Sequence, residues 1–259
     1  MLRKQSGVTV HLLGGFRFVV NGSPLPLPLG CQRLVAFLSL HDRPVQRTFV
    51  AANLWLEKQE ERASANLRSA LWRLGQLDSP VILAEGGTLA LDPSVDVDLR
   101  DVQFEAYRLV GSGLPIAVLP ERTLFDHDLL PDWYDEWLLF ERERLHQLRL
   151  HALDLLSAAF ISVGRTALAI DAACASIAGE PLRESAHRAL ISAHLAAGNR
   201  VEAARQYERF RVSLRDAVGM EPTEEMRRLL DDALAFAESS SAPRPVPPRV
   251  QGPGARGSR

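Results

Sequence analysis

The stretch ERASANLRSALWRLGQL, residues 61–77, has the spacing of an amphipathic helix. Its apolar residues recur three and four positions apart, which places them on one side of a helix and predicts their burial. They are Leu67, Ala70, Leu71, Leu74 and Leu77. The opposite side and its flanks carry arginine, amide, hydroxyl and aromatic groups: Arg62, Asn66, Arg68, Ser69, Trp72, Arg73 and Gln76. Such groups suit DNA base edges, but many solvated helices have the same composition, so the flanking sequence must decide.

Strands and two helices are predicted before this stretch. Apolar residues alternate over 8–12 and 16–20, and Asn21-Gly22 is a tight-turn pair. The alternation continues over 25–29, but the intervening prolines cannot donate to a ladder, so this segment is an edge strand or an extended lead-in. Helical spacing predicts a helix over 31–41, and Thr48 is predicted to cap a second helix that ends at 54–56.

A small β-hairpin is predicted after the stretch, with strands at 81–84 and 89–91 and the turn EGGT at 85–88. Two helices, a third helix with a polar exposed side and a hairpin are together typical of a helix-turn-helix with a wing. The order of elements therefore favours DNA recognition by the third helix.

The second half is predicted to be helical throughout, from about residue 98. A long helix is predicted over 133–160. Similar segments begin at Gly164 and Gly198, 34 residues apart, and Pro181 and Pro222 each precede a second helix. A 34-residue period of helix pairs is the tetratricopeptide (TPR) signature, and such pairs stack to present a concave surface to partners.

The expected fold class is mainly α, with an N-terminal winged helix-turn-helix preceded by β-strands and followed by an all-α, TPR-like repeat domain. We expect three segments: the DNA-binding domain at 1–97, the repeat domain at 98–238 and a disordered, basic tail at 239–259. The tail is predicted from its richness in proline and glycine and from its lack of apolar periodicity.

Composition is ordinary for a globular protein, but the charge is unevenly distributed. The net charge is -2, yet residues 1–100 have a balance of +2, residues 101–238 of -8 and residues 239–259 of +4. A mildly acidic protein still binds phosphates where lysine and arginine gather locally. With two cysteines, no signal-peptide pattern and no apolar run near ~20 residues, we expect a cytoplasmic protein without a membrane span.

At two sets of motifs the chain resembles the SARP family, the winged-helix activators of actinobacterial antibiotic clusters. LWLEKQEERASANLRSALWRL (54–74) is similar to the second and third helices of the winged helix. LLPDWYDEWLLFERERL (129–145), GEPLRESAHRALISAHLAAGNRVEAARQYERF (179–210) and VGMEPTEEM (218–226) are similar to the bacterial transcriptional activator domain, or BTAD. The resemblance covers roughly 8–237. It implies an OmpR-like winged helix fused to a three-repeat helical domain, which binds direct repeats near promoters and recruits RNA polymerase.

The resemblance also implies roles for particular residues. The recognition helix is 61–77, and the candidates for base or phosphate contact are the seven polar and aromatic residues named above. Arg43, Arg47 and Thr48 lie at or before a helix N-terminus, where backbone N–H groups suit a phosphate. Gly86, Gly87 and Thr88 form the wing tip near the minor groove. Glu57, Lys58, Gln59, Glu60 and Glu61 form the loop that faces the polymerase in relatives.

Three positions depart from the family pattern. Trp72 stands where a small polar residue is usual, so it alters base preference or packs in a dimer contact. Gly75 stands where arginine is common and, in a helix interior, costs about 1 kcal/mol relative to alanine. Cys31-Gln32 replaces a more basic lead-in. Each change lowers the affinity expected of a lone monomer, so we expect a homodimer on repeated sites.

Several residues admit other interpretations. The acidic residues Asp126, Asp128, Asp132, Asp135 and Glu136 are candidate cation ligands, but their spacing does not match an EF-hand and favours a solvated loop. A metal at Glu184, His187 and His194 is disfavoured, because they fit packed helix faces with histidine at the rim. Trp133, Tyr134 and Trp137 are expected to pack in the core or between domains, and Cys174 is expected to be buried and inert. Arg68 and Arg73 have an alternative role in pairing with carboxylates such as Glu61.

The sequence therefore predicts a sequence-specific regulator that binds double-stranded DNA and has no cofactor and no metal. It holds no HExxH, GxSxG or GxxxxGK[ST] motif, so we do not expect an enzyme. The rival interpretation is a protein-interaction adaptor whose winged helix has lost DNA binding, which the acidic second half and Gly75 favour.

Overall fold

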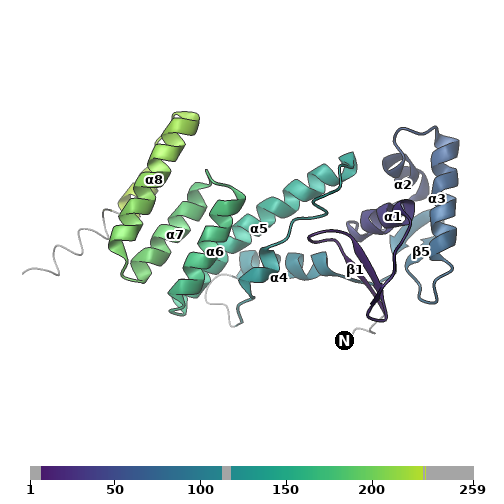
Figure 1. Ribbon diagram of the computed structural model, residues 1–259, viewed down its shortest axis with the longest axis horizontal. Helices are drawn as coiled ribbons and strands as arrows, with labels where there is room; N and C mark the ends of the chain where they lie inside the picture. The colour runs from purple at the N-terminus through teal and green to yellow at the C-terminus, as the bar shows by residue number, and fades with distance from the viewer. Residues whose placement is uncertain (1–6, 113–117, 230, 232–259) are drawn as a thin grey trace, which may run out of the picture.

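The computed structural model describes residues 7–112, 118–229 and 231. They form an elongated molecule with a mixed α/β unit at one end and stacked helices at the other (Figure 1). The first unit contains β1 (Val8–His11), β2 (Arg17–Val20), β3 (Ser23–Pro24), α1 (Leu29–Ser39), β4 (Val45–Gln46), α2 (Arg47–Leu54), α3 (Glu60–Leu74), β5 (Ile82–Glu85), β6 (Thr88–Leu91) and β7 (Asp96–Val97). The helical part contains α4 (Asp98–Ser112), the 3-10 turn η1 (Arg122–Phe125), α5 (Glu136–Ser162), α6 (Thr166–Gly179), α7 (Glu184–Ala196) and α8 (Arg200–Val218). A further helical segment lies at 224–229. The predicted fold class is confirmed.

Two small sheets frame the first unit. One has the strand order β3-β2-β1-β7, and the other has the order β4-β6-β5. Asn21 and Gly22 join β2 to β3 with φ of 50° and 80°, the left-handed values that a two-residue hairpin turn requires. The two-residue strand β7, which runs parallel to β1, was not predicted. Its place depends on pairing with a distant strand, and a segment this short carries no periodic signal.

Two helix starts differ from prediction. The second helix begins at Arg47, with Gln46 as its N-cap and no side-chain cap, so the prediction that Thr48 caps it is wrong. Gln46 still belongs to β4 and pairs with Thr88, which makes the chain turn from strand into helix before Thr48. The long helix begins at Glu136 rather than 133.

The 34-residue period of the second half is visible in the backbone. Gly164 and Gly198 both have left-handed φ, of 74° and 77°. The amide after each glycine donates to a carbonyl five residues earlier: Arg165 to Phe160 and Asn199 to His194, both at 2.8 Å. The helices α6 and α8 follow with the same offset, and Ala169 and Ala203 are both fully buried within them. Equivalent turns thus stack α5 to α8 side by side (Figure 1).

A short segment, 128–137, joins the two parts of the molecule. The Leu130 amide donates to the Leu12 carbonyl at 2.8 Å, and the Gly14 amide donates to the Asp128 carbonyl at 2.9 Å. Trp137 packs edge-on against Phe37 of α1, with ring centroids 5.2 Å apart. One contiguous hydrophobic core runs from the sheets through this junction to α6. We propose a domain boundary at 97/98, where α4 follows β7 directly. The helix α4 packs on β1 of the first unit and on α5 of the helical part.

Two remaining expectations concern the C-terminal tail and membrane-spanning segments. The tail at 239–259 lies outside them. Within them, no helix combines the length and the apolar character that crossing a bilayer requires.

Candidate nucleic-acid interface

The helix α3 is anchored by one side only. Ala63, Leu67, Ala70 and Leu74 are its buried residues, and they pack against α1 and α2. The Cys31 thiol of α1 is directed to the Ala70 carbonyl at 3.7 Å. Burial raises the pKa of this thiol, and the positive charge of Arg73 opposes that effect. The leucine and alanine side of the helix therefore fixes it to the scaffold, as the sequence predicted.

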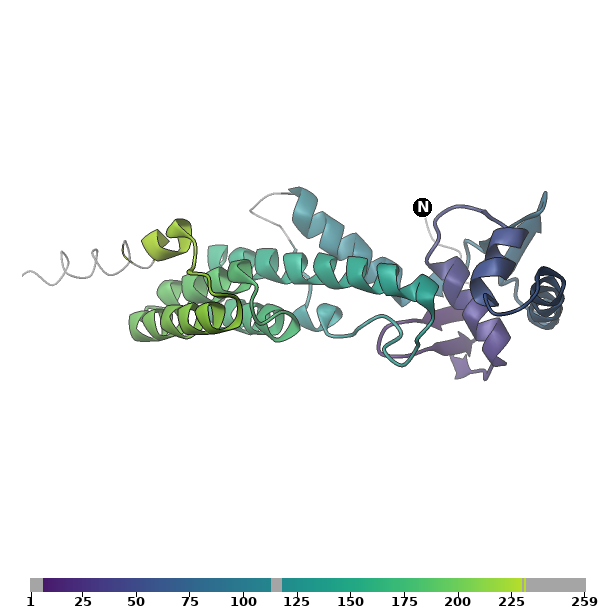
Figure 2. The same ribbon diagram turned by 90° about the horizontal axis from the view of Figure 1, so that it is seen from above.

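The opposite side of α3 faces solvent at one end of the molecule. In both views α3 lies at the right-hand end, and the stacked helices extend away from it (Figures 1 and 2). The repeat helices therefore do not cover this side. The predicted contact residues Arg62, Arg68, Ser69, Trp72, Arg73 and Gln76 are exposed, and Asn66 is half-buried.

The predicted span of the recognition helix is corrected at its C-terminal end. It ends at Leu74, with Gly75 as the C-cap, so Gln76 lies just beyond it. The penalty expected for a glycine in a helix interior therefore does not apply to Gly75, since a C-cap residue flanks the helix and does not belong to its interior.

The predicted loop at 57–61 is shorter than expected. Glu60 and Glu61 form the first turn of α3, where their negative charges complement the helix dipole. Residues 55–59 connect α2 to α3, and of the predicted loop only Glu57, Lys58 and Gln59 lie in this connection, where their side chains are exposed.

The wing tip and the start of α2 lie together. Gly86 and Gly87 form the β5–β6 turn with φ of 54° and 82°. The Thr88 hydroxyl donates to the Glu85 carbonyl at 2.7 Å, which closes the turn. The Arg47 amide donates to the Gly87 carbonyl at 3.0 Å. The structure thus brings the predicted wing residues next to Arg47 and Thr48, while Arg43 is exposed in the turn before β4.

Five arginines near α3, α2 and the wing have no acidic partner among the described residues: none forms an ion pair with a carboxylate. They are Arg43, Arg47, Arg62, Arg68 and Arg73. The alternative in which Arg68 or Arg73 pairs with Glu61 is therefore wrong for the described residues. Their positive charge remains available to an external anion.

Comparisons with known proteins address both halves. The family model "Bacterial transcriptional activator domain" (BTAD) matches residues 122–234. The second half of the chain is therefore similar to this domain, and residues 122–234 are called the activator domain below. The fold is similar to that of EmbR from Mycobacterium tuberculosis, solved in complex with a low-affinity phosphopeptide, with a TM-score of 0.66 and 23% identity. The match covers 89% of this chain and 65% of the EmbR chain, so this chain spans less than two thirds of EmbR. No curated protein matches the sequence.

The family model supports the resemblance to the SARP family over the second half of the chain. The family-model match contains all three motifs of the second half, and the fold likeness to EmbR covers 89% of the chain. The identity to EmbR is low enough that this likeness establishes the fold alone.

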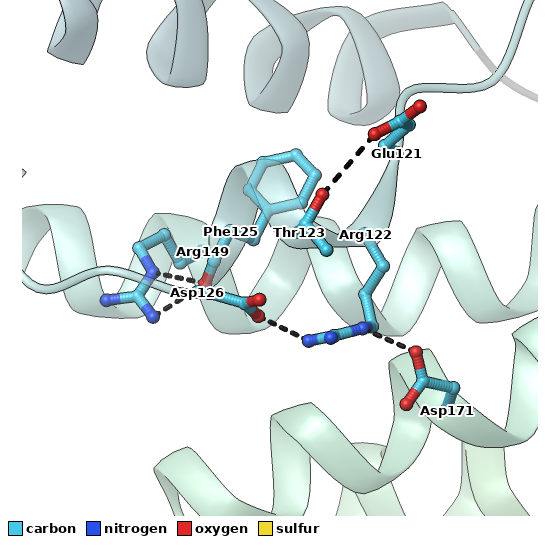
Figure 3. A network of polar contacts seen from close by, with 7 residues as sticks. All are labelled: Glu121, Arg122, Thr123, Phe125, Asp126, Arg149 and Asp171. Atoms are coloured by element: carbon cyan, nitrogen blue, oxygen red, sulfur yellow. Dashed lines mark hydrogen bonds and ion pairs between the residues drawn. The ribbon is translucent and has the colours of Figure 1, made fainter.

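The acidic residues at the start of the activator domain hold arginines. Arg122 of η1 pairs with Asp126 and, at 2.5 Å, with Asp171 of α6 (Figure 3). Arg149 of α5 pairs with Asp128 and donates to the Phe125 carbonyl at 2.6 and 2.9 Å. These contacts fix η1 against α5 and α6. The described residues contain no group of three or more His, Cys, Asp and Glu that would hold a metal.

His187 is buried, which corrects its predicted place at the rim of α7. Its Nε2 lies 2.9 Å from the Pro181 carbonyl, its Nδ1 lies 2.7 Å from the Gln206 amide nitrogen, and its ring stacks on Phe210. Burial lowers the pKa of His187, and the bond to Pro181 opposes that effect. The Glu184 carboxylate accepts hydrogen bonds from the amide and hydroxyl of Thr223. Two of the three candidate ligands, Glu184 and His187, therefore bond within the fold.

Two other expectations for the activator domain are corrected. Cys174 is exposed, because α6 directs it away from the buried alanine side of the helix. Tyr134 is 89% exposed. Trp133 and Trp137, in contrast, pack between the two parts of the molecule as expected.

The sequence missed the residues that connect the interface to the activator domain. Arg33 of α1 pairs with Asp135, and Arg142 of α5 donates to backbone carbonyls of the junction. The spacing of each arginine on its own helix is ordinary, so only the three-dimensional contact reveals its role.

Proposed function

We propose that this protein is a transcriptional regulator that binds specific double-stranded DNA through α3. One observation carries the proposal: the side of α3 that bears Arg62, Arg68 and Arg73 faces solvent and, within the described residues, has no carboxylate partners. DNA supplies the missing negative charge, since each phosphate attracts arginine and releases counterions on binding.

The shape of this end of the molecule fits a duplex. The major groove of B-DNA is about 12 Å wide and admits an α-helix, and winged helices place their third helix there. With α3 in the groove, Arg47 and Thr48 at the start of α2 reach the phosphates beside it. The turn at Gly86, Gly87 and Thr88 then lies towards the neighbouring minor groove.

Activation, the operator and the partners belong to the same proposal. The activator domain supports a positive effect on transcription. The family resemblance implies direct repeats, a homodimer and RNA polymerase, with the loop at 57–59 and the adjoining Glu60 and Glu61 facing the polymerase. We propose these for this chain, together with a cytoplasmic location and a function that is not enzymatic.

The test compares two pairs of arginines in the full-length protein. Duplexes are first selected from a random-sequence pool with the unaltered protein, and binding is then measured over a salt series. The variant Arg68→Ala/Arg73→Ala is expected to lose about 100-fold or more in affinity, because each good side-chain–base pair contributes about 1–3 kcal/mol. The matched control, Arg205→Ala/Arg211→Ala, removes two arginines that pair with Glu202 and Glu208 in α8. It is expected to bind like the unaltered protein.

The salt series separates the proposal from the adaptor alternative. A protein that neutralises several phosphates loses affinity steeply as salt rises, with a slope of about -0.9 per contact on logarithmic axes. An adaptor enriches no duplex at any salt concentration. That result, or equal binding by both double variants, would contradict the proposal.

A further inference from the structure

Trp72 lies at the middle of the exposed side of α3. With 3.6 residues per turn, it falls about 170° from the centre of the buried stripe formed by Ala63, Leu67, Ala70 and Leu74. Arg73 falls only about 90° from that centre and Asn66 only about 70°. The indole is 67% exposed. A partner that approaches the exposed side of α3 therefore contacts Trp72 first.

The residues nearest to this ridge divide by chemistry. Ala65, two turns earlier, lies at nearly the same angle as Trp72 and adds only a methyl group. Arg68 and Ser69 lie about 50° to either side of the ridge. Near Trp72 the ridge is thus apolar with polar groups on its two flanks, and the exposed Glu61 lies on the same line three turns earlier.

The indole packs only in part against the first unit. It is absent from the buried residues of α3 and borders a recess of about 340 Å³ between α3 and β5. Leu71, Pro80 and Ile82 line the same recess. A partner that meets this side of α3 therefore covers a large, exposed apolar side chain.

The geometry points to a thymine methyl group as that partner; this inference rests on the proposed function. In the major groove, guanine, cytosine and adenine present only hydrogen-bond donors and acceptors at their edges, whereas thymine adds an apolar C5-methyl group. Indole offers one donor and no acceptor, so its main contact is apolar. Trp72 packs against the C5-methyl of a thymine on the groove floor and makes the protein prefer thymine there. Arg62, on one shoulder of the helix, contacts a phosphate.

The experiment replaces thymine by uracil, which removes only the methyl group. Each thymine of a duplex selected with the full-length protein is replaced in turn, and affinity is measured for the unaltered protein and for Trp72→Ala. At one thymine in each half-site, the unaltered protein is expected to lose about fourfold in affinity, which corresponds to one buried methyl group. Trp72→Ala is expected to bind the thymine and uracil duplexes equally. The uracil replacement and Trp72→Ala together form a double-mutant cycle, so the effects of uracil on DNA shape cancel.

Two further variants make the cycle specific. Arg62→Ala is expected to weaken binding to both duplexes and to keep the fourfold ratio between the affinities for the thymine and uracil duplexes. Trp72→Phe keeps an aromatic face and is expected to retain part of the ratio. Thermal unfolding of Trp72→Ala is expected to match that of the unaltered protein, because the side chain contributes little to the core.

Each outcome decides between the two proposals. Indifference of the unaltered protein to every uracil, or a ratio that survives Trp72→Ala, overturns the inference and leaves DNA binding intact. A loss of cooperativity between protomers with no change in the ratio also overturns it. Selection that enriches no duplex overturns the proposed function, and this inference with it.

Discussion

The arginines of the two halves of the molecule are used differently. In the activator domain most of them pair with acidic side chains, such as Arg122 with Asp126 and Asp171, and Arg149 with Asp128. At the end that carries α3, Arg62, Arg68 and Arg73 have no such partner among the described residues. The net charges of -8 and +2 for residues 101–238 and 1–100 reflect this difference.

The contrast separates arginines that build the fold from those that are free to bind. A paired guanidinium positions two elements, and its charge is already compensated. An unpaired guanidinium on a rigid helix keeps its full attraction for an anion and leaves little to be rearranged on binding. The charge of the whole chain, which is nearly neutral, conceals both groups.

Arg142 gives the largest expected effect on the structural side of this contrast. It donates to the Leu129 carbonyl at 3.0 Å, to the Trp133 carbonyl at 2.8 Å and to the Leu130 carbonyl. Arg142→Ala leaves these carbonyls at the junction without their donor, and we expect a loss of about 3 kcal/mol in unfolding free energy, measured by urea denaturation. Its neighbour Arg144 pairs on the surface with Glu141, so Arg144→Ala is expected to cost no more than about 0.5 kcal/mol. Equal losses would mean that Arg142 does not hold the junction.

The next effect depends on pH and is confined to the activator domain. Because burial lowers the pKa of His187, the folded state favours the neutral ring. The stabilisation is therefore complete above the unfolded pKa of about 6.5 and is lost as the pH falls towards the lower folded value. We expect unfolding free energy to decrease between pH 7 and 5, by less than the loss in Arg142→Ala.

His187→Gln provides the control, since it keeps an amide near Gln206 and does not titrate in this range. Its stability is expected to depend less on pH, as followed by urea denaturation at each pH. An unchanged pH dependence would assign the effect to another group.

The smallest effect is expected at the surface pairs of Figure 3. Asp171 is 55% exposed as a side chain, and Arg122 retains Asp126 when Asp171 is replaced. Asp171→Asn is therefore expected to cost about 0.5 kcal/mol in unfolding free energy and to leave duplex binding unchanged. A clear change in DNA affinity would show that the two sets of arginines are not independent.

The elements with a strong local signal were predicted well. The hairpin at 81–91, the turn at Asn21-Gly22 and the 34-residue period all depend on neighbouring residues, and the structure contains each of them. The exposed side of α3 was also predicted, because the apolar stripe of a helix determines which residues are left for solvent.

The errors arose where distant segments meet. Thr48 is not a cap because β4 pairs with β6 up to Gln46. Cys174 is exposed because α6 packs on α5 and α7 with its alanine side, which Cys174 does not share. Neither contact leaves a periodic trace in the local sequence.

The sequence by itself determined which helix has one anchored and one free side, since periodicity and side-chain chemistry are local properties. Only the tertiary structure decided that the free side lies at the end of the molecule, that its arginines lack acidic partners in the described part of the chain, and that the junction at 128–137 joins the two halves. Those features depend on which distant carboxylates and carbonyls reach each guanidinium, and that is set by the packing of the whole chain.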